Sequence, residues 1–383
     1  GKGVAELPDG RVCFIPFAVT GDKLEIELTK IQKKFCEGKI LNILEPSADR
    51  VEPKCAHYGD CGGCNYQHIS YEKQLEIKAN QFDNALKRIA KIEELPAIDA
   101  VIASPKEYAY RNKITFSPYR NNNMDVEYGF VGQDNRSIIP ISNCEIATEA
   151  IQAKIPTVKR TPWAQQNANR EKPRQATMRK DANDVTIYYG TAPKGMPWCT
   201  EDFNGKDMRV PLGSFHQVNE VVSPLLSDLV TTWINDLDVS MVVDAFCGSG
   251  FLSLGTDKRV IGIEQDESGA TAAQHNAVEF GKEKTHTYKQ GNANKMITRY
   301  LNGKTDKVLI LDPPRAGFGA KTLEAIARFT PDHILYVSCD PSTLARDLKG
   351  ILEVGYEIDK RAILDMFPQT FHFESAVLLK KTK

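Results

Sequence analysis

Several features are missing from this chain of 383 residues, and each absence excludes a class of protein. No stretch approaches the roughly 18 uncharged apolar residues that a membrane-spanning helix needs. No basic segment followed by an apolar one stands near the N-terminus, so nothing indicates a secretory signal. Lysine and arginine (49) almost balance aspartate and glutamate (50), so bulk charge does not indicate a nucleic-acid partner. Such a partner has to be sought in local patches.

The cysteine content does not fit a secreted disulfide framework. The nine cysteines are an odd number, and only one group of them is close in sequence. Secreted disulfide proteins usually carry an even number at regular spacing. We therefore expect a reducing compartment, the cytoplasm, in which some thiols act as metal ligands or nucleophiles.

Residues 1–45 are expected to form a domain of short strands. The β-rich runs at 11–17, 23–30 and 37–44 predict strands. Short strands without helices suggest a small β-barrel, and such barrels often bind RNA, although a packing appendage explains the pattern equally well. Because the chain starts at Gly1 rather than Met, we expect the beginning of this domain to be missing.

Residues 46–204 combine a cysteine-rich turn region, a helix expected over 70–90 and further strands, which predicts a central α+β domain. Its window 151–180 holds eight basic residues against one acid, Glu171. Such a run is usually a solvated face, but beside an RNA-binding barrel it also favours phosphate contact. The basic residues are Lys154, Lys159, Arg160, Arg170, Lys172, Arg174, Arg179 and Lys180.

Residues 205–383 alternate strands with helices. This pattern predicts an α/β, Rossmann-like, doubly wound and mostly parallel sheet, whose ligand binds at the carboxyl ends of the strands. Asp244 and Glu264 end two of these strands, and Gly248 and Gly250 allow a tight turn beside a ligand. A carboxylate at the second strand end can accept hydrogen bonds from ribose. The loop lacks the GxGxxG fingerprint of dinucleotide sites, which favours a cofactor without phosphates, commonly S-adenosylmethionine.

Two later strand ends carry further chemistry. Residues 312–315 (DPPR) fix the Asp312 carboxylate in a stiff turn, although prolines also simply end strands. Cys339 follows the next strand, where a thiol that emerges into the crevice is suited to act as a nucleophile rather than as a buried apolar residue. Glu374 stands near the C-terminus as a possible base, although acids there are more often solvated.

The cysteine group Cys55, Cys61 and Cys64, with Cys144 downstream, predicts a metal site. Four thiolates suit zinc or an iron–sulfur cluster, and the spacing does not choose between them. The Cys-x3-Cys-x2-Cys run of radical S-adenosylmethionine enzymes is absent, so that chemistry is not expected.

Four segments together resemble the RNA 5-methyluridine methyltransferases: 244–250 (DAFCGSG), 312–315 (DPPR), 336–347 (YVSCDPSTLARD) and 365–375 (DMFPQTFHFES). The cysteine set is similar to that of the branch with a [4Fe–4S] cluster, and residues 1–45 look like a TRAM domain, an RNA-binding β-barrel. The resemblance implies a monomeric enzyme that uses S-adenosylmethionine to methylate uridine C5. It favours 23S rRNA over tRNA, because the branch with both features mostly modifies large-subunit rRNA.

The resemblance also implies roles for single residues. The nucleophile falls on Cys339 and the proton-abstracting base on Glu374. Two positions depart from the family: Phe251 replaces an expected asparagine contact, and Asp340 replaces an asparagine, with a charge that would raise the pKa of Cys339. The S-adenosylmethionine contacts fall on Gln217, Phe246, Glu264, Asn292 and Asp312, and the cluster ligands on Cys55, Cys61, Cys64 and Cys144.

Three alternatives stay open at this point. The first is a tRNA uridine-C5 methyltransferase. The second is a methyltransferase that acts on a base amino group, since Asp-Pro-Pro occurs there too and no cysteine nucleophile is needed. The third is a metal-containing RNA-binding protein without activity, which the departures at Phe251 and Asp340 motivate.

Overall fold

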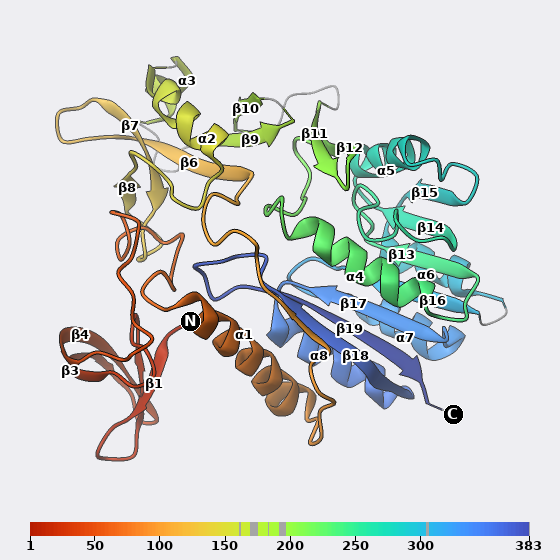
Figure 1. Cartoon of the computed structure of the whole chain (residues 1–383), viewed down its shortest axis with the longest axis horizontal. Helices are drawn as coiled ribbons and strands as arrows, with labels where there is room; N and C mark the ends of the chain where they lie inside the picture. The colour runs from red at the N-terminus through yellow and green to blue at the C-terminus, as the bar shows by residue number, and fades with distance from the viewer. Residues whose placement is uncertain (161, 169–174, 183, 191–196, 304–305, 383) are drawn as a thin grey trace.

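The computed structural model describes residues 1–382 except 161, 169–174, 183, 191–196 and 304–305. Within these residues the strands form four sheets. No helix among them is long and apolar enough to cross a membrane. Figure 1 shows a small N-terminal sheet on one side, a sheet of eight strands on the other, and helix α1 between them.

The N-terminal sheet has the strand order β1-β2-β4-β3. Its small core centres on Cys13, Ile15 and Cys36, and strand β2 runs parallel to β4. The strands expected in residues 1–45 are confirmed; a closed barrel of the TRAM type stays a prediction. The strands are β1 (Gly3–Glu6), β2 (Val12–Ile15), β3 (Lys23–Ile31) and β4 (Phe35–Glu45).

The middle of the chain contributes a second sheet, of order β10-β9-β6-β7-β8. Its core contains Phe116, Tyr128 and Met178, with Ile151 of α2 packed on it. A two-stranded hairpin, β11-β12, follows. The elements are β6 (Lys113–Arg120), β7 (Val126–Val131), β8 (Ile138–Pro140), α2 (Glu149–Lys154), a 3-10 helix (Ile155–Arg160), α3 (Pro162–Asn167), β9 (Ala176–Asp181), β10 (Asp184–Tyr189), β11 (Trp198–Phe203) and β12 (Lys206–Pro211).

The fourth and largest sheet has the order β15-β14-β13-β16-β17-β19-β18-β5. Its central strands run parallel, while β19 is antiparallel to both neighbours. The apolar runs of β16 and β17 are buried because helices cover both faces of the sheet. The strands are β13 (Met241–Ala245), β14 (Arg259–Glu264), β15 (His286–Gln290), β16 (Lys307–Leu311), β17 (His333–Ser338), β18 (Tyr356–Leu364) and β19 (Glu374–Lys381).

Two hydrophobic clusters lie against this sheet, one on each face. Helices α4 and α5 belong to the first cluster, and α6, α7 and α8 to the second. The expected doubly wound α/β architecture is therefore confirmed for this part. The helices are α4 (Ser223–Asn235), α5 (Glu267–Glu279), α6 (Ala293–Leu301), α7 (Ala320–Phe329) and α8 (Pro341–Glu353).

The middle of the chain also reaches into the large sheet. Helix α1 (Tyr71–Ala85), continued by a π-helical turn (Leu86–Ala90), buries Phe82 and Leu86 in the second cluster beside α8. Strand β5 (Ala100–Ile102) pairs with β18 as the eighth strand. The predicted helix over 70–90 is confirmed. The division at 45 and 204 stays a prediction, and α1 and β5 pack on the sheet of the following part.

Candidate active site

The carboxyl ends of β13, β14, β16 and β17 meet at one edge of the large sheet, as the strand pairing requires. This edge therefore gathers the residues that follow each strand. They are the glycine loop after Ala245, Glu264 at the end of β14, Asp312 after β16 and Cys339 after β17.

The pairing of β17 with β19 brings Cys339 close to Glu374. Ser338 pairs with Ser375 in this antiparallel ladder, and the Ser375 hydroxyl donates to the Ser338 carbonyl at 2.9 Å. Cys339 is the next residue on one strand and Glu374 the preceding one on the other. Cys339 is half-buried and Glu374 is 1% exposed. The predicted nucleophile and base are thus neighbours.

The environment of Cys339 holds it as a thiol in the free protein. Burial is the largest cause that raises the pKa of Cys339 to about 11, and the negative charge of Glu374 is the next. Arg315 opposes both through its charge and a hydrogen bond. Forming the thiolate therefore depends on a positive charge near the sulfur.

The Glu374 carboxyl carries a raised pKa. Burial is the main cause, and the charge of Asp312 adds to it, while a hydrogen bond with Gln217 and the charge of Arg315 act in the other direction. A carboxyl of raised pKa is a stronger base once it is ionised. Gln217 is itself 3% exposed, so the structure brings this expected cofactor contact beside the base.

Two more carboxyls at this edge have raised pKa values. Burial raises the pKa of Asp244 to about 7, with a contribution from the charge of Glu264. Burial and the charge of Asp244 raise the pKa of Asp312 to about 7. An edge with so many acids is suited to a ligand that carries positive charge.

The glycine loop leaves open space next to Glu264. The Gly248 amide donates to one oxygen of the Glu264 carboxylate at 2.9 Å, and the Asp266 amide donates to the other at 2.7 Å. Gly248 has a φ of +54°, and a Cβ on it would meet nothing within 4 Å. Phe246 also has a positive φ, 67°. Backbone can therefore approach a ligand closely here.

Asn292 lies farther along the same edge. It directly precedes α6, and its side-chain amide donates to Gln265 at 3.1 Å. Gln265 follows Glu264 in sequence. The structure thus brings Asn292 near the end of β14, as an expected cofactor contact requires.

The two departures from the family pattern have structural roles. Phe251 is 5% exposed, and its ring packs edge-on against Phe203 and His216 in the core. Asp340 caps α8, since its carboxylate accepts from the amides of Ser342 and Thr343 at 2.9 and 2.8 Å. The charges that raise the pKa of Cys339 most come from Glu374 and Asp312, not from Asp340.

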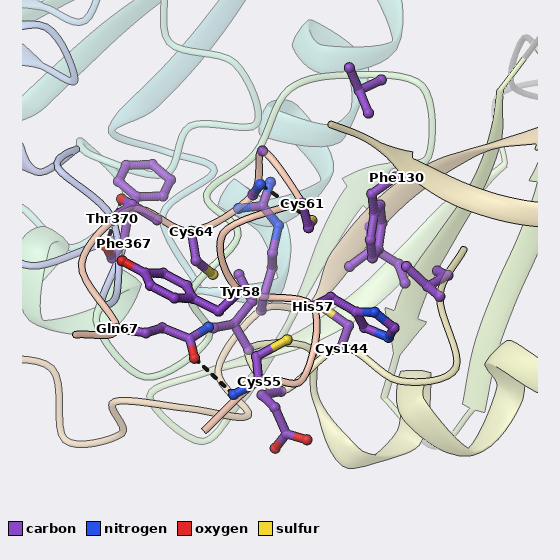
Figure 2. Close-up of a pocket in the computed structure, with 18 of the residues that line it drawn as sticks. Cys55, His57, Tyr58, Cys61, Cys64, Gln67, Phe130, Cys144, Phe367 and Thr370 are labelled. Atoms are coloured by element: carbon purple, nitrogen blue, oxygen red, sulfur yellow. Dashed lines mark hydrogen bonds between the residues drawn. The ribbon is translucent and has the colours of Figure 1, made fainter. Parts of the chain in front are cut away.

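The four expected metal ligands line one pocket, which has a volume of about 430 Å³ (Figure 2). Cys55, Cys61, Cys64 and Cys144 all face it. Across the described part of the chain, however, no three His, Cys, Asp or Glu side chains are close enough together to hold a metal ion. The donor set fits a soft metal or cluster in its chemistry, and the metal itself stays a prediction.

The same pocket extends to the catalytic edge. Its wall includes Arg315, Phe367, Thr370 and His372 in addition to the cysteines. Sequence reasoning gave no role to Arg315 or His372. The signal was available for Arg315, which stands three residues after Asp312 in the same stiff turn.

The basic window does not present a free positive face in its described part. Arg179 is fully buried and pairs with Glu201 at 2.8 Å, so the expected phosphate contact is wrong for this residue. Lys154 pairs with Asp184 and Lys180 with Glu220. Arg170, Lys172 and Arg174 lie outside the described residues, as do the side chains of Lys159 and Arg160.

Comparisons with known proteins identify similar sequences. The family model described as tRNA (Uracil-5-)-methyltransferase matches residues 202–382. A 23S rRNA (uracil(1939)-C(5))-methyltransferase of Shewanella woodyi is 30% identical over 99% of this chain and 93% of its own. An uncharacterized RNA methyltransferase of Listeria innocua is 31% identical over 99% of this chain and 94% of its own.

A solved structure has the same fold over nearly the whole chain. It is the Pyrococcus abyssi tRNA (uracil-54, C5)-methyltransferase in complex with S-adenosyl-L-homocysteine. The TM-score is 0.74 at 22% identity, and the match covers 99% of this chain and 100% of the other. This likeness concerns the fold alone. The two relatives of 30% identity or more, together with the family model, show that the chain belongs to the RNA (uracil-5-)-methyltransferase family.

Proposed function

We propose that this protein transfers a methyl group from S-adenosylmethionine to C5 of a specific uridine, in 23S rRNA rather than tRNA. The observation that carries the proposal is the pairing of β17 with β19, which ends at Ser338 and Ser375 and so leaves Cys339 and Glu374 side by side. The Shewanella relative, which spans almost the whole chain, supports 23S rRNA as the target. The names of the family model and of the Pyrococcus enzyme point to tRNA instead.

The two side chains fit the two difficult steps of this reaction. Uridine C5 is too weak a nucleophile to attack the methyl group directly. The Cys339 thiolate therefore adds to C6, and the electrons of the C5–C6 double bond move so that C5 becomes the nucleophilic carbon of an enolate. The sulfonium of the cofactor supplies the methyl group that C5 then accepts in line. Glu374 removes the C5 proton, the C6–S bond breaks, and the thiolate leaves. The reaction thus yields methylated uridine, the demethylated cofactor and one proton.

The charges around the site support this assignment. Because burial and Glu374 keep Cys339 protonated at rest, thiolate formation relies on Arg315 and on the positive cofactor. Glu374, whose pKa is raised, is a strong base after ionisation. The target uridine has to leave its stack to reach both groups, which costs about a few kcal/mol.

The acidic edge supports a cationic cofactor. We assign Gln217, Phe246, Glu264, Asn292 and Asp312 as its contacts. Burial and the charge of Asp244 raise the pKa of Asp312, and a cation bound beside this carboxyl would favour its ionised form. Glu264, fixed by two backbone amides, is suited to accept hydrogen bonds from ribose hydroxyls.

We also propose that Cys55, Cys61, Cys64 and Cys144 hold a [4Fe–4S] cluster, with zinc as the alternative. The support is that these four thiols line one pocket. A brown protein with broad visible absorbance would decide for iron.

In the same proposal residues 1–45 are a TRAM-like RNA-binding domain, 46–204 the cluster domain and 205–383 the methyltransferase domain of a cytoplasmic monomer.

The deciding experiment follows the covalent adduct between protein and RNA. Cys339→Ala should form no adduct and no methylated uridine, and Glu374→Gln should form adduct that persists on a denaturing gel. Cys199→Ala, a buried thiol of β11 away from the site, is the matched control and should behave as wild type. Methyl transfer by Cys339→Ala would exclude the proposed chemistry.

The RNA target needs a separate measurement. The protein is incubated with rRNA and tRNA and labelled S-adenosylmethionine, and the modified nucleotide is located by mass mapping. Label in 23S rRNA is expected. Label confined to tRNA would show that the proposed RNA target is wrong, while the proposed chemistry would stand.

A further inference from the structure

The loop of residues 365–373, which joins β18 to β19, leads directly into the base. It contains Phe367, Thr370 and His372, all on the wall of the pocket beside Arg315. At the foot of the loop, Leu364 pairs with Glu374 across the hairpin. A shift of the loop therefore shifts the carboxyl that has to reach the C5 proton.

Distant segments hold the backbone of this loop, which has no helix or strand of its own. The Asp365 amide donates to Ile102 of β5 at 2.9 Å. Asn219 donates to the Met366 carbonyl at 3.2 Å, and Tyr110 donates to the Pro368 carbonyl at 3.0 Å. Each of these three partners is far from the loop in sequence. A segment whose polar backbone groups are bonded in this way is fixed in one conformation.

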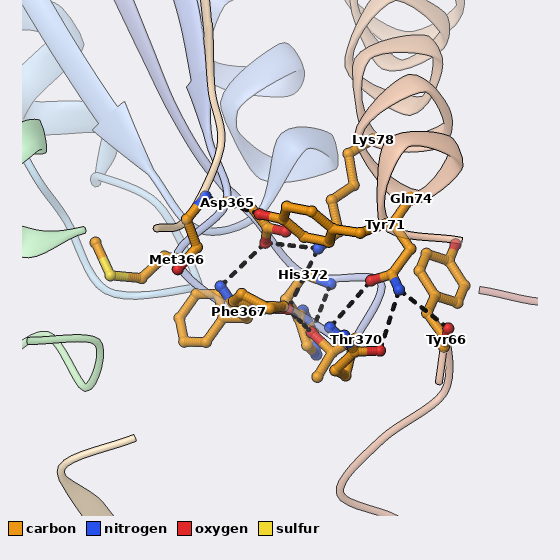
Figure 3. A network of polar contacts seen from close by, with 12 residues as sticks. Tyr66, Tyr71, Gln74, Lys78, Asp365, Met366, Phe367, Thr370 and His372 are labelled. Atoms are coloured by element: carbon orange, nitrogen blue, oxygen red, sulfur yellow. Dashed lines mark hydrogen bonds and ion pairs between the residues drawn. The ribbon is translucent and has the colours of Figure 1, made fainter. Parts of the chain in front are cut away.

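Helix α1 provides a further contact to this loop, a buried ion pair (Figure 3). The ammonium of Lys78 lies 2.6 Å from the carboxylate of Asp365, and the two side chains are 0% and 1% exposed. Lys78 also donates to the Phe367 carbonyl at 3.2 Å, and the Phe367 amide donates to Asp365 at 3.2 Å. These three residues close a polar ring at the start of the loop.

A second contact from the same face of α1 holds the far side of the loop. The Gln369 amide donates to the Gln74 side chain at 3.0 Å, and the two side-chain amides bond at 3.1 Å. Gln369 has a φ of +67°, a strained conformation for this residue. Its carbonyl accepts from the amides of Asn65 and Tyr66, both at 3.0 Å. The strained turn is thus held by α1 and by the segment after Cys64.

We propose that Lys78 and Gln74 of α1 are positioning residues, which hold the 365–373 loop so that Glu374 can take the C5 proton from the adduct. This inference rests on the proposed function. Neither residue touches the reacting atoms. A methyltransferase sheet does not need a buried lysine at this place for its core, because Phe82 and Leu86 on the same helix already supply apolar contacts.

The test measures two quantities for each variant: how much adduct forms, and how fast it is resolved. The amount of adduct measures how much of the enzyme is active, and the rate at which the adduct is resolved measures proton abstraction. Lys78→Met is expected to form adduct in a near wild-type amount but to resolve it at least tenfold more slowly. The double variant Lys78→Met/Asp365→Asn, which leaves no unpaired buried charge, should recover much of the rate. Lys73→Met, a partly exposed lysine of the same helix that pairs with Asp49 and Glu76 and not with the loop, is the control and should match wild type.

The outcomes separate this inference from the proposed function. If wild-type protein and Glu374→Gln both fail to form adduct, the proposed function fails. If Glu374→Gln accumulates adduct and Lys78→Met resolves it at the wild-type rate, the positioning role is overturned. A Lys78→Met protein that folds less well but resolves its adduct normally also overturns it. Should Lys78→Met not fold, Gln74→Met is judged by the same rate, and a wild-type rate refutes the inference.

Discussion

Binding of S-adenosylmethionine is expected to release protons near neutral pH. In the free protein the pKa values of Asp244 and Asp312 are both raised to about 7, mainly by burial. At pH 7 each carboxyl is then protonated about half of the time, so the two hold about one proton together. The cofactor brings a sulfonium and an ammonium, and a cation beside a carboxyl lowers its pKa. About one proton should therefore leave for each cofactor bound.

The sign of the pH dependence follows from these shifts. Below both pKa values two protons have to leave on binding, so the affinity is lowest there. Above both values none has to leave, and the affinity is highest. Between pH 8 and pH 6 the affinity is expected to fall by up to about 100-fold, tenfold for each carboxyl.

Calorimetry at pH 7 measures this directly. The binding enthalpy is compared in two buffers of different ionisation enthalpy, and the difference gives the number of protons released. Asp244→Asn should release about half as many, and S-adenosylhomocysteine, which lacks the sulfonium charge, should release fewer than the cofactor. An enthalpy that does not depend on the buffer, or a net uptake of protons, would refute the reasoning.

Three substitutions test local features of the fold by thermal or denaturant unfolding. Asp340→Ala removes the cap of α8 and should lower the free energy of unfolding by about 1 kcal/mol, while an unchanged stability would contradict the capping role. Gly262→Ala puts a methyl group into the Tyr288 ring and should cost about 1–3 kcal/mol; a neutral result would mean that the ring can move. Tyr336→Phe removes a buried bond of 2.7 Å to Asp347 and should cost about 1–3 kcal/mol, with a loss below 0.5 kcal/mol arguing against it.

The catalytic edge could be predicted from the sequence because its information is local. Apolar runs define the strands, and the residue that follows each run marks the strand end, as with Asp312 and Cys339. Parallel strands then bring their ends to one edge whatever the details of packing. The position of Glu374 beside Cys339 does not follow from strand ends alone. Glu374 lies on an antiparallel strand, and the sequence does not reveal the register of that strand.

The contacts between distant segments could not be predicted. Lys78 resembles any surface lysine of a helix, and its partner Asp365 is 287 residues away. Arg179 belongs to a run that looks solvated, and only the fold buries it against Glu201. In each case a charged residue can be buried because an opposite charge pairs with it, and the periodicity of the sequence gives no sign of that pairing.

The pairing of α1 with a segment so far along the chain has a consequence for biosynthesis. At about 5–20 residues per second, roughly 15–60 s pass between the synthesis of Lys78 and that of Asp365, 287 residues later. For the first part of that interval the apolar side chains of Phe82 and Leu86 have been synthesised without the large sheet and helix α8 that later cover them. Until β13–β17 and α8 have emerged, the first half of the protein therefore exposes apolar surface on the ribosome, which favours aggregation.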